Sequence, residues 1–440
     1  MPYRIGVDIG GTFTDLYAYD TKSKEIKCVS KPSTPENYAL GVLDVIESTG
    51  IEMGDIEFIV HGTTVATNSI IERKFAKVAF ITTGGFRDLI EIGRYHRKTL
   101  YDPYEEKPKP IAKRRNRYTV IEKIDRDGNT IIPLDEKSIR TIADEISAKD
   151  IDTISIGFMN SHANPAHEQS AKKIIEDMIP GIYISTSSEI LPTIGALGRF
   201  TTSIINAALY PTINDYITSL QKQLAKKNFQ GRLLMVQSNG GAKMADLIRK
   251  NPETLLLSGP AGGVIGANYL SRSAENKNII TFDMGGTSCD ISVVEAGEPM
   301  MTVESEIDWD MPIPLPVIEI QTIGAGGGSI AWIDEGGTIK VGPKSAGAKP
   351  GPVCYDLGGT EPTVTDANLV LGFLDTENFL GGKMNVNYDL AKKAIEKLGM
   401  ELGLNRVKTA EGILEIVNEN MANTASDMRL IIIPATRSLL

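Results

Sequence analysis

The stretch DIGGTFTD, Asp8 to Asp15, returns almost unchanged as DMGGTSCD, Asp283 to Asp290. The two copies agree at five of eight positions and begin 283 − 8 = 275 residues apart. Each follows a short apolar, β-branched run, YRIGV for the first and NIITF for the second, which is typical of a strand. We therefore expect two related strand–turn–strand units that face each other across a cleft and hold a nucleoside triphosphate from both sides.

The residue types in these turns suit phosphate. Paired glycines reach backbone conformations closed to other residues, so several N–H groups can approach one anion, and threonine hydroxyls add donors. A carboxylate does not favour phosphate directly. We therefore expect Asp8 and Asp283 to be catalytic through a hydrated Mg²⁺ ion, which takes one or two carboxylates together with phosphate oxygens. The predicted nucleotide-binding residues are Gly10, Gly11, Thr12, Thr14, Asp15, Gly285, Gly286, Thr287, Ser288 and Asp290.

A single copy of this turn has an ordinary alternative, a β-hairpin that uses Gly and Asp for conformational reasons. Two copies favour the phosphate interpretation. Other phosphate-binding motifs do not apply, because the chain has no GxxxxGK[ST] loop and neither copy has the spaced glycines of a dinucleotide-binding fingerprint.

A second candidate region is HGTTVATN, His61 to Asn68, at the end of the apolar run FIVHG. Open α/β sheets bind ligands at the carboxyl ends of their strands. We expect His61 to contact substrate or to act as a general acid or base, with a capping turn as the alternative. Thr63, Thr64 and Asn68 follow on the turn and the first helical residues, and we predict that they contact substrate.

A third region is GAGGGS, Gly324 to Ser329. Four glycines in five residues cost chain entropy unless something requires close approach of the backbone. We predict that Gly326 and Gly327 contact substrate or phosphate, and a tight turn between strands is the alternative. Arg94 is a further predicted substrate contact, because guanidinium groups bind carboxylate or phosphate as a fork.

Composition places limits on function. A net charge of −10 and a pI near 5.2 argue against nucleic acid or an anionic membrane as the main partner. The three cysteines show no paired spacing, and the spacing of the four histidines predicts no metal site beyond nucleotide-bound magnesium. The first strand is expected from about Tyr3, no apolar run reaches the length of a membrane span, and we expect a cytoplasmic enzyme.

Alternating strand and helix patterns predict an α/β protein. YRIGV, TDLYAYD and EIKCVSK indicate a meander, YTVIEKI and TIIPL indicate a hairpin, and a long helical pattern runs to about Lys226. At 440 residues we expect at least two domains. We place the boundary near Leu191, which gives an N-terminal domain, 1–190, with the first phosphate loop and a second, 191–440, with the second loop.

The repeated DxGGT turns resemble those of the actin, sugar-kinase and heat-shock-chaperone ATPase superfamily, and SGPAGGVIGA, Ser258 to Ala267, resembles its connecting helix. The resemblance narrows along the chain. Blocks including HGTTVATNSIIERK, GFRDLIEIGR, TIGAGGGSIAW, VGPKSAGAKPGPVCY and TVTDANLVLG are similar, in order, to A-type subunits of the hydantoinase and 5-oxoprolinase family. The resemblance implies two actin-like ATPase domains, each a mixed sheet with flanking helices and a phosphate hairpin.

The same resemblance implies an activity. It indicates ATP- and Mg-dependent hydrolysis of a cyclic amide such as 5-oxoproline, a hydantoin or another lactam, completed with a B-type partner subunit in a hetero-oligomer. The related carboxylation of a ketone is an alternative. A small-molecule kinase or a non-catalytic ATP-switched protein would share the loops, although the HGTTVATN block argues against both.

One feature departs from the family pattern. The A-type subunits continue past this length through a Gly-rich segment on the adenine side of the second ATP half, whereas here the resemblance fades after NENMA, Asn418 to Ala422. The last glycine is Gly412. We therefore expect an A-type chain that is truncated at its C-terminal end.

Overall fold

The computed structural model describes residues 2–10, 13–34, 37–96, 101–102, 104, 106–306, 309–347, 349–382 and 384–437, without the side chains of 380, 381 and 429–437. Gly11 and Thr12 of the predicted nucleotide site lie outside the described residues. The chain forms two compact units: unit 1 is Met1–Ala261 with Met301–Val317, and unit 2 is Gly262–Met300 with Ile318–Leu440. The domain boundary that we placed near Leu191 stays a prediction.

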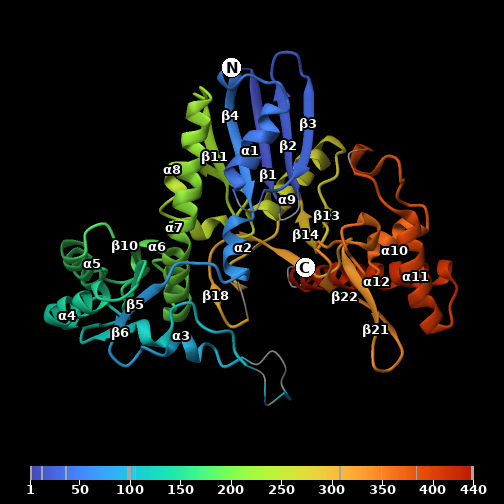
Figure 1. Cartoon of the computed structure of the whole chain (residues 1–440). Helices are drawn as coiled ribbons and strands as arrows, with labels where there is room; N and C mark the ends of the chain where they lie inside the picture. Colours follow the sequence, from blue (N-terminus) through green and yellow to red (C-terminus); the bar gives the residue numbers. More distant parts are fainter. Residues whose placement is uncertain are drawn as a thin grey trace. The chain divides into compact units, whose positions relative to one another are not determined.

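Unit 1 contains a six-stranded mixed sheet with the order β12-β11-β4-β1-β2-β3 (Figure 1). Strands β1 (Tyr3–Ile9), β2 (Phe13–Asp20) and β3 (Ile26–Pro32) form the predicted antiparallel meander. On the other side of β1, β4 (Ile56–Thr63) pairs in parallel, followed by parallel β11 (Arg232–Val236) and antiparallel β12 (Ala242–Met244). Strand β1 therefore has a partner on both edges.

Alternation along β1 explains which face of this sheet is buried. Ile5, Val7 and Ile9 are at most 3% exposed, whereas Arg4, just before them, and Asp8, between Val7 and Ile9, are exposed. Helices α1 (Tyr38–Glu47) and α7 (Ala196–Lys226) supply apolar residues to the same core. The opposite face carries Asp8, so burial of one face determines on which side the first predicted loop presents its carboxylate.

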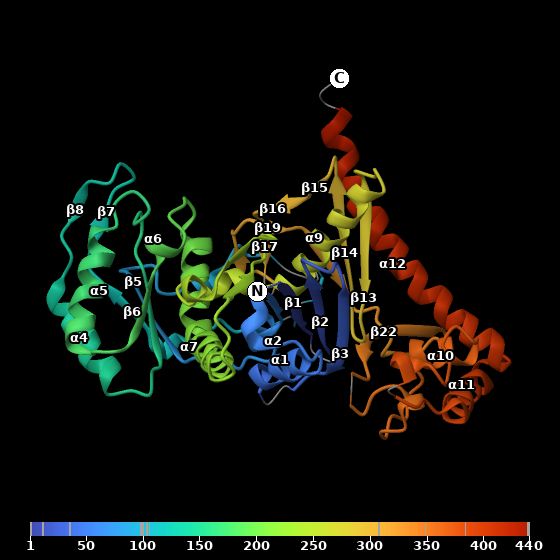
Figure 2. The same ribbon diagram turned by 90° about the horizontal axis from the view of Figure 1, so that it is seen from above.

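A second sheet in unit 1 is entirely parallel, with the order β10-β9-β5-β6. Its strands are β5 (Val78–Thr83), β6 (Arg117–Val120), β9 (Thr153–Gly157) and β10 (Tyr183–Thr186). Helices α4 (Glu136–Ser147) and α5 (Ala166–Met178) cover one face and α7 lies on the other (Figure 2). The hairpin predicted from YTVIEKI and TIIPL is present in a shorter form, because β7 (Lys123–Ile124) pairs antiparallel with β8 (Thr130–Ile132), whereas residues 118–120 belong to parallel β6.

Unit 2 repeats the beginning of the first sheet. Strand β14 (Cys289–Glu295) pairs antiparallel with β13 (Ile279–Met284) on one edge and with β20 (Ile320–Ile323) on the other. Helix α12 (Arg406–Arg437) packs on this sheet, where Met421, Ala425 and Met428 meet the side chains of β14. The hairpin of β21 (Ser329–Ile333) and β22 (Ile339–Ser345) packs with α10 (Val364–Val370), α11 (Tyr388–Leu402) and α12 around a further core.

The remaining elements are short, apart from α9 (Ser258–Ser273), within which the chain passes from unit 1 to unit 2. They are α2 (Val65–Ile71), α3 (Leu89–Ile92), α6 (Ser187–Ile190), α8 (Ala245–Ile248), β15 (Glu298–Pro299), β16 (Met301–Thr302), β17 (Ser305–Glu306), β18 (Pro312–Ile313), β19 (Val317–Ile318) and the 3-10 turns Met53–Asp55, Arg114–Asn116, Pro252–Leu255, Val353–Tyr355 and Phe379–Gly382. No helix in the described part of the chain is long and apolar enough to cross a lipid bilayer.

A buried polar network joins α7 to the parallel sheet. Arg199 is 1% exposed, and its guanidinium donates to the Phe158 carbonyl at 2.8 Å and to the Ser187 hydroxyl at 3.1 Å. Glu168, fully buried, accepts from the Phe158 N–H at 2.8 Å and from the Ser187 hydroxyl at 2.6 Å. The Arg199 guanidinium and the Glu168 carboxylate are thus both buried, and both bond to Phe158 and Ser187. Removing either charge would leave the other buried without a countercharge.

We expect Arg199→Met to lower the free energy of unfolding by about 3–5 kcal/mol, because it leaves the Glu168 carboxylate buried without a countercharge. Urea denaturation measures the change. The matched control is Arg126→Met, whose side chain is 90% exposed and which should unfold like the wild type. Equal unfolding midpoints for the two variants would show that the network does not stabilise unit 1.

Candidate functional site

The first DxGGT turn joins β1 to β2 with a defined register. Asp8 lies opposite Asp15 across the strand pair, and Ile9 lies opposite Thr14. The Gly10 N–H donates to the Phe13 carbonyl at 2.9 Å, which closes the turn. The Gly10 carbonyl in turn accepts from the Ser33 hydroxyl at 2.8 Å. The described ends of this predicted phosphate loop are therefore held by backbone and hydroxyl contacts within unit 1.

The second turn repeats this geometry in unit 2. Asp283 lies opposite Asp290, and the Gly285 N–H donates to the Ser288 carbonyl at 2.9 Å. Adding the repeat offset of 275 to Asp8, Asp15, Gly10 and Phe13 gives Asp283, Asp290, Gly285 and Ser288, so register and turn bond are the same in both copies. Gly285, Gly286 and Thr287 are exposed. The sequence repeat is thus a structural repeat, with one copy in each unit.

Glycine backbone surrounds the Asp8 carboxylate. A Cβ added to Gly62, on neighbouring β4, would lie 2.6 Å from Asp8 Oδ1, and one added to Gly259, in α9, would lie 3.3 Å from the same atom. Both distances are tighter than ordinary carbon–oxygen contact, so these positions require glycine for the carboxylate to stay where it is. In unit 2, a Cβ on Gly263 would lie 3.7 Å from Asp283 Oδ2. Each carboxylate therefore lies beside a glycine of α9.

The Gly-rich stretch GAGGGS packs directly on the second turn. A Cβ on Gly326 would lie 2.6–2.7 Å from backbone atoms of Thr287 and Ser288. The Gly327 N–H donates to the Gly285 carbonyl at 3.0 Å, and the Gly328 N–H donates to the Gly286 carbonyl at 2.6 Å. These contacts explain the glycine density by close approach of two backbone segments. The substrate contacts predicted for Gly326 and Gly327 stay a prediction, since the described contacts position the loop.

Electrostatics at the second turn favour a cation. Burial raises the pKa of the Asp290 carboxyl, and the negative charge of Asp283 raises it further, while the Thr322 hydroxyl, which donates to Asp290 Oδ1 at 2.5 Å, opposes the rise. Two carboxylates close enough to repel each other are stabilised by a bound cation. No cluster of three or more His, Cys, Asp or Glu side chains suited to a metal occurs among the described residues. A donor set of one or two carboxylates fits an ion that keeps most of its water, as Mg²⁺ does.

His61 is buried inside unit 1 and is not at a turn. It lies in β4, is 0% exposed, and contacts the Val7 carbonyl through Nδ1 at 3.1 Å and the Tyr216 hydroxyl through Nε2 at 2.5 Å. Because a carbonyl can only accept, Nδ1 carries the proton and Nε2 accepts from Tyr216. Burial lowers the pKa of His61 to about 4. This environment favours a positioning role, and the predicted acid–base role is not supported by any contact in the described structure.

The other residues of the HGTT block hold strand ends together. The Thr64 N–H and hydroxyl donate to the Ile9 carbonyl at 3.2 and 3.0 Å. Asn68 Nδ2 donates to the Thr64 hydroxyl at 3.3 Å. The carbonyl of the buried Thr63 accepts from the Ser258 hydroxyl at 2.9 Å. These residues lie around the strand that ends in the first turn, as the sequence indicated, and their substrate contacts stay a prediction.

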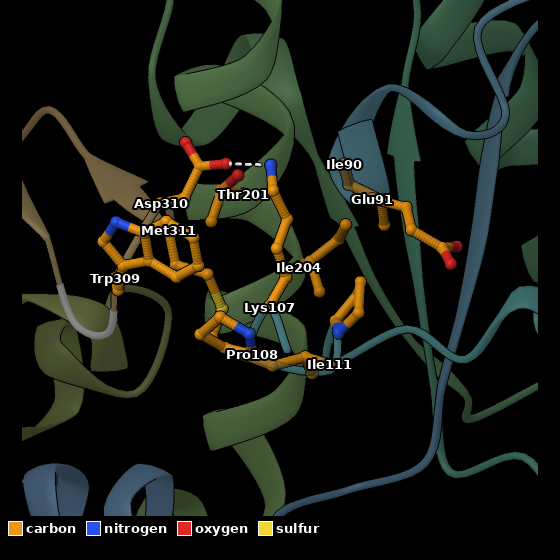
Figure 3. A pocket seen from close by; sticks show the side chains of 11 residues that line it. Ile90, Glu91, Lys107, Pro108, Ile111, Thr201, Ile204, Trp309, Asp310 and Met311 are labelled. Atoms are coloured by element: carbon orange, nitrogen blue, oxygen red, sulfur yellow. Dashed lines mark hydrogen bonds and ion pairs between the residues drawn. The ribbon is translucent and has the colours of Figure 1, made fainter. Parts of the chain in front are cut away.

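Arg94 lies in a separate part of unit 1. Its N–H donates to Asp310 Oδ1 at 2.9 Å, and its guanidinium reaches Glu306 at 3.4 Å. Asp310 also pairs with Lys107 Nζ at 2.7 Å, and this ion pair lies over an apolar recess lined by Ile90, Ile111, Ile204, Trp309 and Met311 (Figure 3). Arg94 thus already contacts two carboxylates of this chain, those of Asp310 and Glu306, and its predicted contact with substrate stays a prediction.

Sequence reasoning missed several residues that shape the two turns. They are Ser33, Gly62, Gly259, Thr322 and Gly328. Gly62 and Gly259 lie within the HGTT and SGPAGG blocks, so their motifs carried a signal, although not the specific contact with Asp8. Thr322 begins the TIGAGGGSIAW block, but nothing local indicated its contact with Asp290, which is 32 residues away in the chain.

Comparison with known proteins shows to which family this chain belongs. The family model described as Hydantoinase/oxoprolinase matches residues 199–430, and the model described as Hydantoinase/oxoprolinase N-terminal region matches residues 4–179. An uncharacterized protein of Methanocaldococcus jannaschii is 42% identical over 436 residues, which cover 96% of this chain and 64% of the relative. The acetophenone carboxylase gamma subunit of Aromatoleum aromaticum is 35% identical over 444 residues, which cover 95% of this chain and 60% of the relative.

A solved structure gives the same result for the fold. The ATP-dependent caprolactamase from Pseudomonas jessenii matches with a TM-score of 0.85 and 34% identity, covering 97% of this chain and 63% of that chain. The predicted mixed α/β fold is confirmed. This chain spans less than two thirds of the length of each of these three relatives.

We expect the buried His61 to make stability depend on pH. Its folded pKa is lowered to about 4, so its contribution is complete above the unfolded value of about 6.5 and is lost as pH falls toward 4. Over this window the loss is on the order of 3 kcal/mol. In urea denaturation, His61→Gln should show a shallower fall than the wild type, and His96→Gln, at an exposed position, should match the wild type. Parallel curves for wild type and His61→Gln would contradict the assignment.

We expect Gly62→Ala to weaken ATP binding at least tenfold, because the new Cβ would lie 2.6 Å from Asp8 Oδ1 and displace that carboxylate. Gly54→Ala is the matched control, since a Cβ there meets no atom within 4 Å. Titration with Mg·ATP measures affinity, and circular dichroism checks that both variants fold. Wild-type affinity in a folded Gly62→Ala variant would separate Asp8 from nucleotide binding.

Proposed function

Because this chain belongs to the hydantoinase/oxoprolinase family, we propose that it is the A-type subunit of an ATP-dependent cyclic-amide hydrolase. The observation that carries the proposal is the pair of identical hairpins, each with an exposed carboxylate beside a glycine turn. The ATP dependence stated for the caprolactamase gives these turns a ligand of matching chemistry. Hydantoins, 5-oxoproline and related lactams are the substrate class.

The proposed nucleotide site consists of two actin-like halves. In this proposal both turns bind phosphates of the same ATP, with the N–H groups of the Gly-Gly-Thr segments as donors. Asp8 and Asp283 would hold a hydrated Mg²⁺ ion, and Asp290 would add negative charge beside Asp283. The packing of Gly326 to Gly328 on the second turn keeps its backbone in place, so that little reorganisation is needed when phosphate binds.

The chemical task explains the use of ATP. An amide carbonyl is a poor electrophile. ATP, when bound, would supply a phosphoryl group to the amide oxygen with release of ADP. Water would then add at the activated carbon, the C–N bond would break with the nitrogen leaving as the amine, and hydrolysis of the resulting acyl phosphate would release phosphate and the carboxylate. The residues of this chain need only position the two reactants and neutralise charge, which is how phosphoryl-transfer sites lower their barrier. No protein nucleophile is required for this step.

A second candidate is a subunit of an ATP-dependent ketone carboxylase. The 35% identity to the acetophenone carboxylase gamma subunit supports it. A ketone is activated at its enol oxygen by the same phosphoryl transfer, so the turns would serve either reaction. The relative is one subunit of an assembly by its name, and we propose that this chain likewise works with a B-type subunit in a cytoplasmic hetero-oligomer.

The test is phosphate release from ATP in the presence of Mg²⁺ with a panel of lactams, hydantoins and ketones, with and without the B-type partner. We expect stimulation by a lactam or hydantoin and a ring-opened product. Stimulation by a ketone alone selects the carboxylase. No stimulation by any compound, with partner present, rejects both enzymatic assignments.

In this assay Asp283→Asn should reduce turnover at least 100-fold and leave the fold intact, because the amide cannot replace the carboxylate beside the ion. Asp427→Asn, at an exposed position of α12 in the same unit, should keep wild-type turnover. Undiminished activity of Asp283→Asn refutes the magnesium role.

A further inference from the structure

Thr365 is linked to the second turn by one peptide group of the Gly-rich stretch. The Gly327 carbonyl accepts from the N–H and from the hydroxyl of Thr365, each at 2.8 Å. The N–H of the same peptide group, which is that of Gly328, donates to the Gly286 carbonyl at 2.6 Å. Because the carbonyl and the N–H of a trans peptide group point in opposite directions, this group connects Thr365 on one side to Gly286 on the other.

The next peptide group, within the turn itself, continues this chain of hydrogen bonds. The Gly286 carbonyl points at Gly328, so the N–H of Thr287, in the same peptide group, points away from the Gly-rich stretch. The Thr287 N–H donates no hydrogen bond within the part of the chain that the structure describes. The chain of hydrogen bonds therefore begins at Thr365, passes through two peptide groups and ends at an N–H that is available to a ligand.

A second chain of hydrogen bonds runs beside the first. The Ser329 N–H donates to the Gly326 carbonyl at 3.0 Å, and the Gly327 N–H, in the same peptide group, donates to the Gly285 carbonyl at 3.0 Å. The Gly286 N–H at its end likewise points away from the Gly-rich stretch and has no acceptor among the described residues. Hydrogen bonds in such chains polarise one another, which makes the last N–H a better donor. Two successive N–H groups of this kind suit one anion.

The first turn is held at the equivalent carbonyl by a different donor. Adding the offset of 275 to Gly10 gives Gly285. The Gly10 carbonyl accepts from the Ser33 hydroxyl at 2.8 Å, whereas the Gly285 carbonyl accepts from the Gly327 N–H at 3.0 Å. The same offset takes Ser33 to position 308 (33 + 275 = 308), so the two donors are not copies of each other. Two unrelated donors on the same carbonyl indicate that both turns need its orientation fixed.

The Thr365 hydroxyl is not needed to begin helix α10. A capping box of Thr363 and Asp366 holds the start of this helix, since each side chain accepts from the backbone N–H of the other residue. Asp366 is fully buried and also accepts from the Cys354 N–H at 2.8 Å. Thr365 takes no part in this capping box, and its hydroxyl donates to Gly327 instead. Valine at position 365, which has nearly the shape of threonine, should therefore leave the helix intact.

We propose that Thr365 is a positioning residue of the proposed nucleotide site, where it aims the Thr287 N–H at a phosphate oxygen through the peptide group of Gly327 and Gly328. This role rests on the proposed function for its ligand, ATP, and on the hydrogen bonds above for its geometry. All of these residues belong to unit 2. The second chain of hydrogen bonds begins at a backbone N–H, that of Ser329, so Thr365 is the side chain through which the arrangement can be altered.

Titration of the full chain with Mg·ATP tests this role. We expect Thr365→Val to weaken binding about three- to tenfold, because one of the two hydrogen bonds that hold the Gly327 carbonyl is lost. Thr365→Ser keeps the hydroxyl and should bind within about twofold of the wild type. The matched control is Thr409→Val, at another buried threonine of unit 2, whose hydroxyl donates to the Asn405 carbonyl at 2.9 Å. This control loses a similar hydrogen bond and should bind like the wild type.

Circular dichroism checks that the variants fold. Equal affinities of the wild type and a folded Thr365→Val variant overturn the proposal, and so does a Thr365→Ser variant that binds as weakly as Thr365→Val. A wild-type chain that does not bind Mg·ATP rejects the proposed function, and hydrogen exchange then decides whether Thr365 holds the turn.

Hydrogen exchange of single amides, corrected for their intrinsic rates, needs no nucleotide. In the wild type the bonded Gly328 amide should exchange roughly tenfold slower than the Thr287 amide. In Thr365→Val the Gly328 amide should exchange about threefold faster than in the wild type, and in Thr409→Val its rate should not change. Equal corrected rates for Gly328 and Thr287 in the wild type, or a Gly328 rate that Thr365→Val leaves unchanged, contradict the positioning role.

Discussion

Glycine backbone lies close to both DxGGT motifs, and this close approach leaves room for the Asp8 carboxylate and for the backbone of the second turn. At Gly62 there is no space for a side chain because the Asp8 carboxylate occupies it, and at Gly326 the backbone of the second turn does so. Because glycine has no side chain, the Asp8 carboxylate and the second turn can lie directly against the backbone at these two positions. The ordinary cost of glycine in a strand or loop is offset here by the geometry that it permits.

The two units use the same hairpin in different surroundings. In unit 1 the hairpin belongs to a six-stranded sheet and its inner face is fully buried. In unit 2 the hairpin has the short strands β20 and β15 as further neighbours, and the Gly-rich stretch and α12 also pack on it. The register and the turn hydrogen bond are the same in both copies, so the repeat preserves the backbone geometry of the two turns. The burial of the hairpin strands differs between the copies.

Local pattern predicted much of the fold. Alternating residues located β1, β2 and β3, and the apolar spacing up to about Lys226 located α7. The same reasoning misassigned only the first part of YTVIEKI, because residues 118–120 pair with β5, a strand distant in the chain, while Lys123 and Ile124 form the predicted hairpin. His61 illustrates the limit for the site. Its position at a strand end suggested contact with substrate, but its ring is buried and bonds to Tyr216, 155 residues away, on a helix whose packing no local pattern reveals.

For the glycines of GAGGGS, in contrast, the local sequence was informative. Density in GAGGGS indicated correctly that backbone must approach something closely, while the partner, the 285–288 turn, became visible only in the structure. We propose that both turns bind one triphosphate. A crystal structure with Mg²⁺ and a non-hydrolysable ATP analogue is the decisive measurement. We expect phosphate oxygens in contact with the Gly10–Phe13 and the Gly285–Ser288 turns, and a nucleotide that contacts neither turn, or only one, would refute the proposed site.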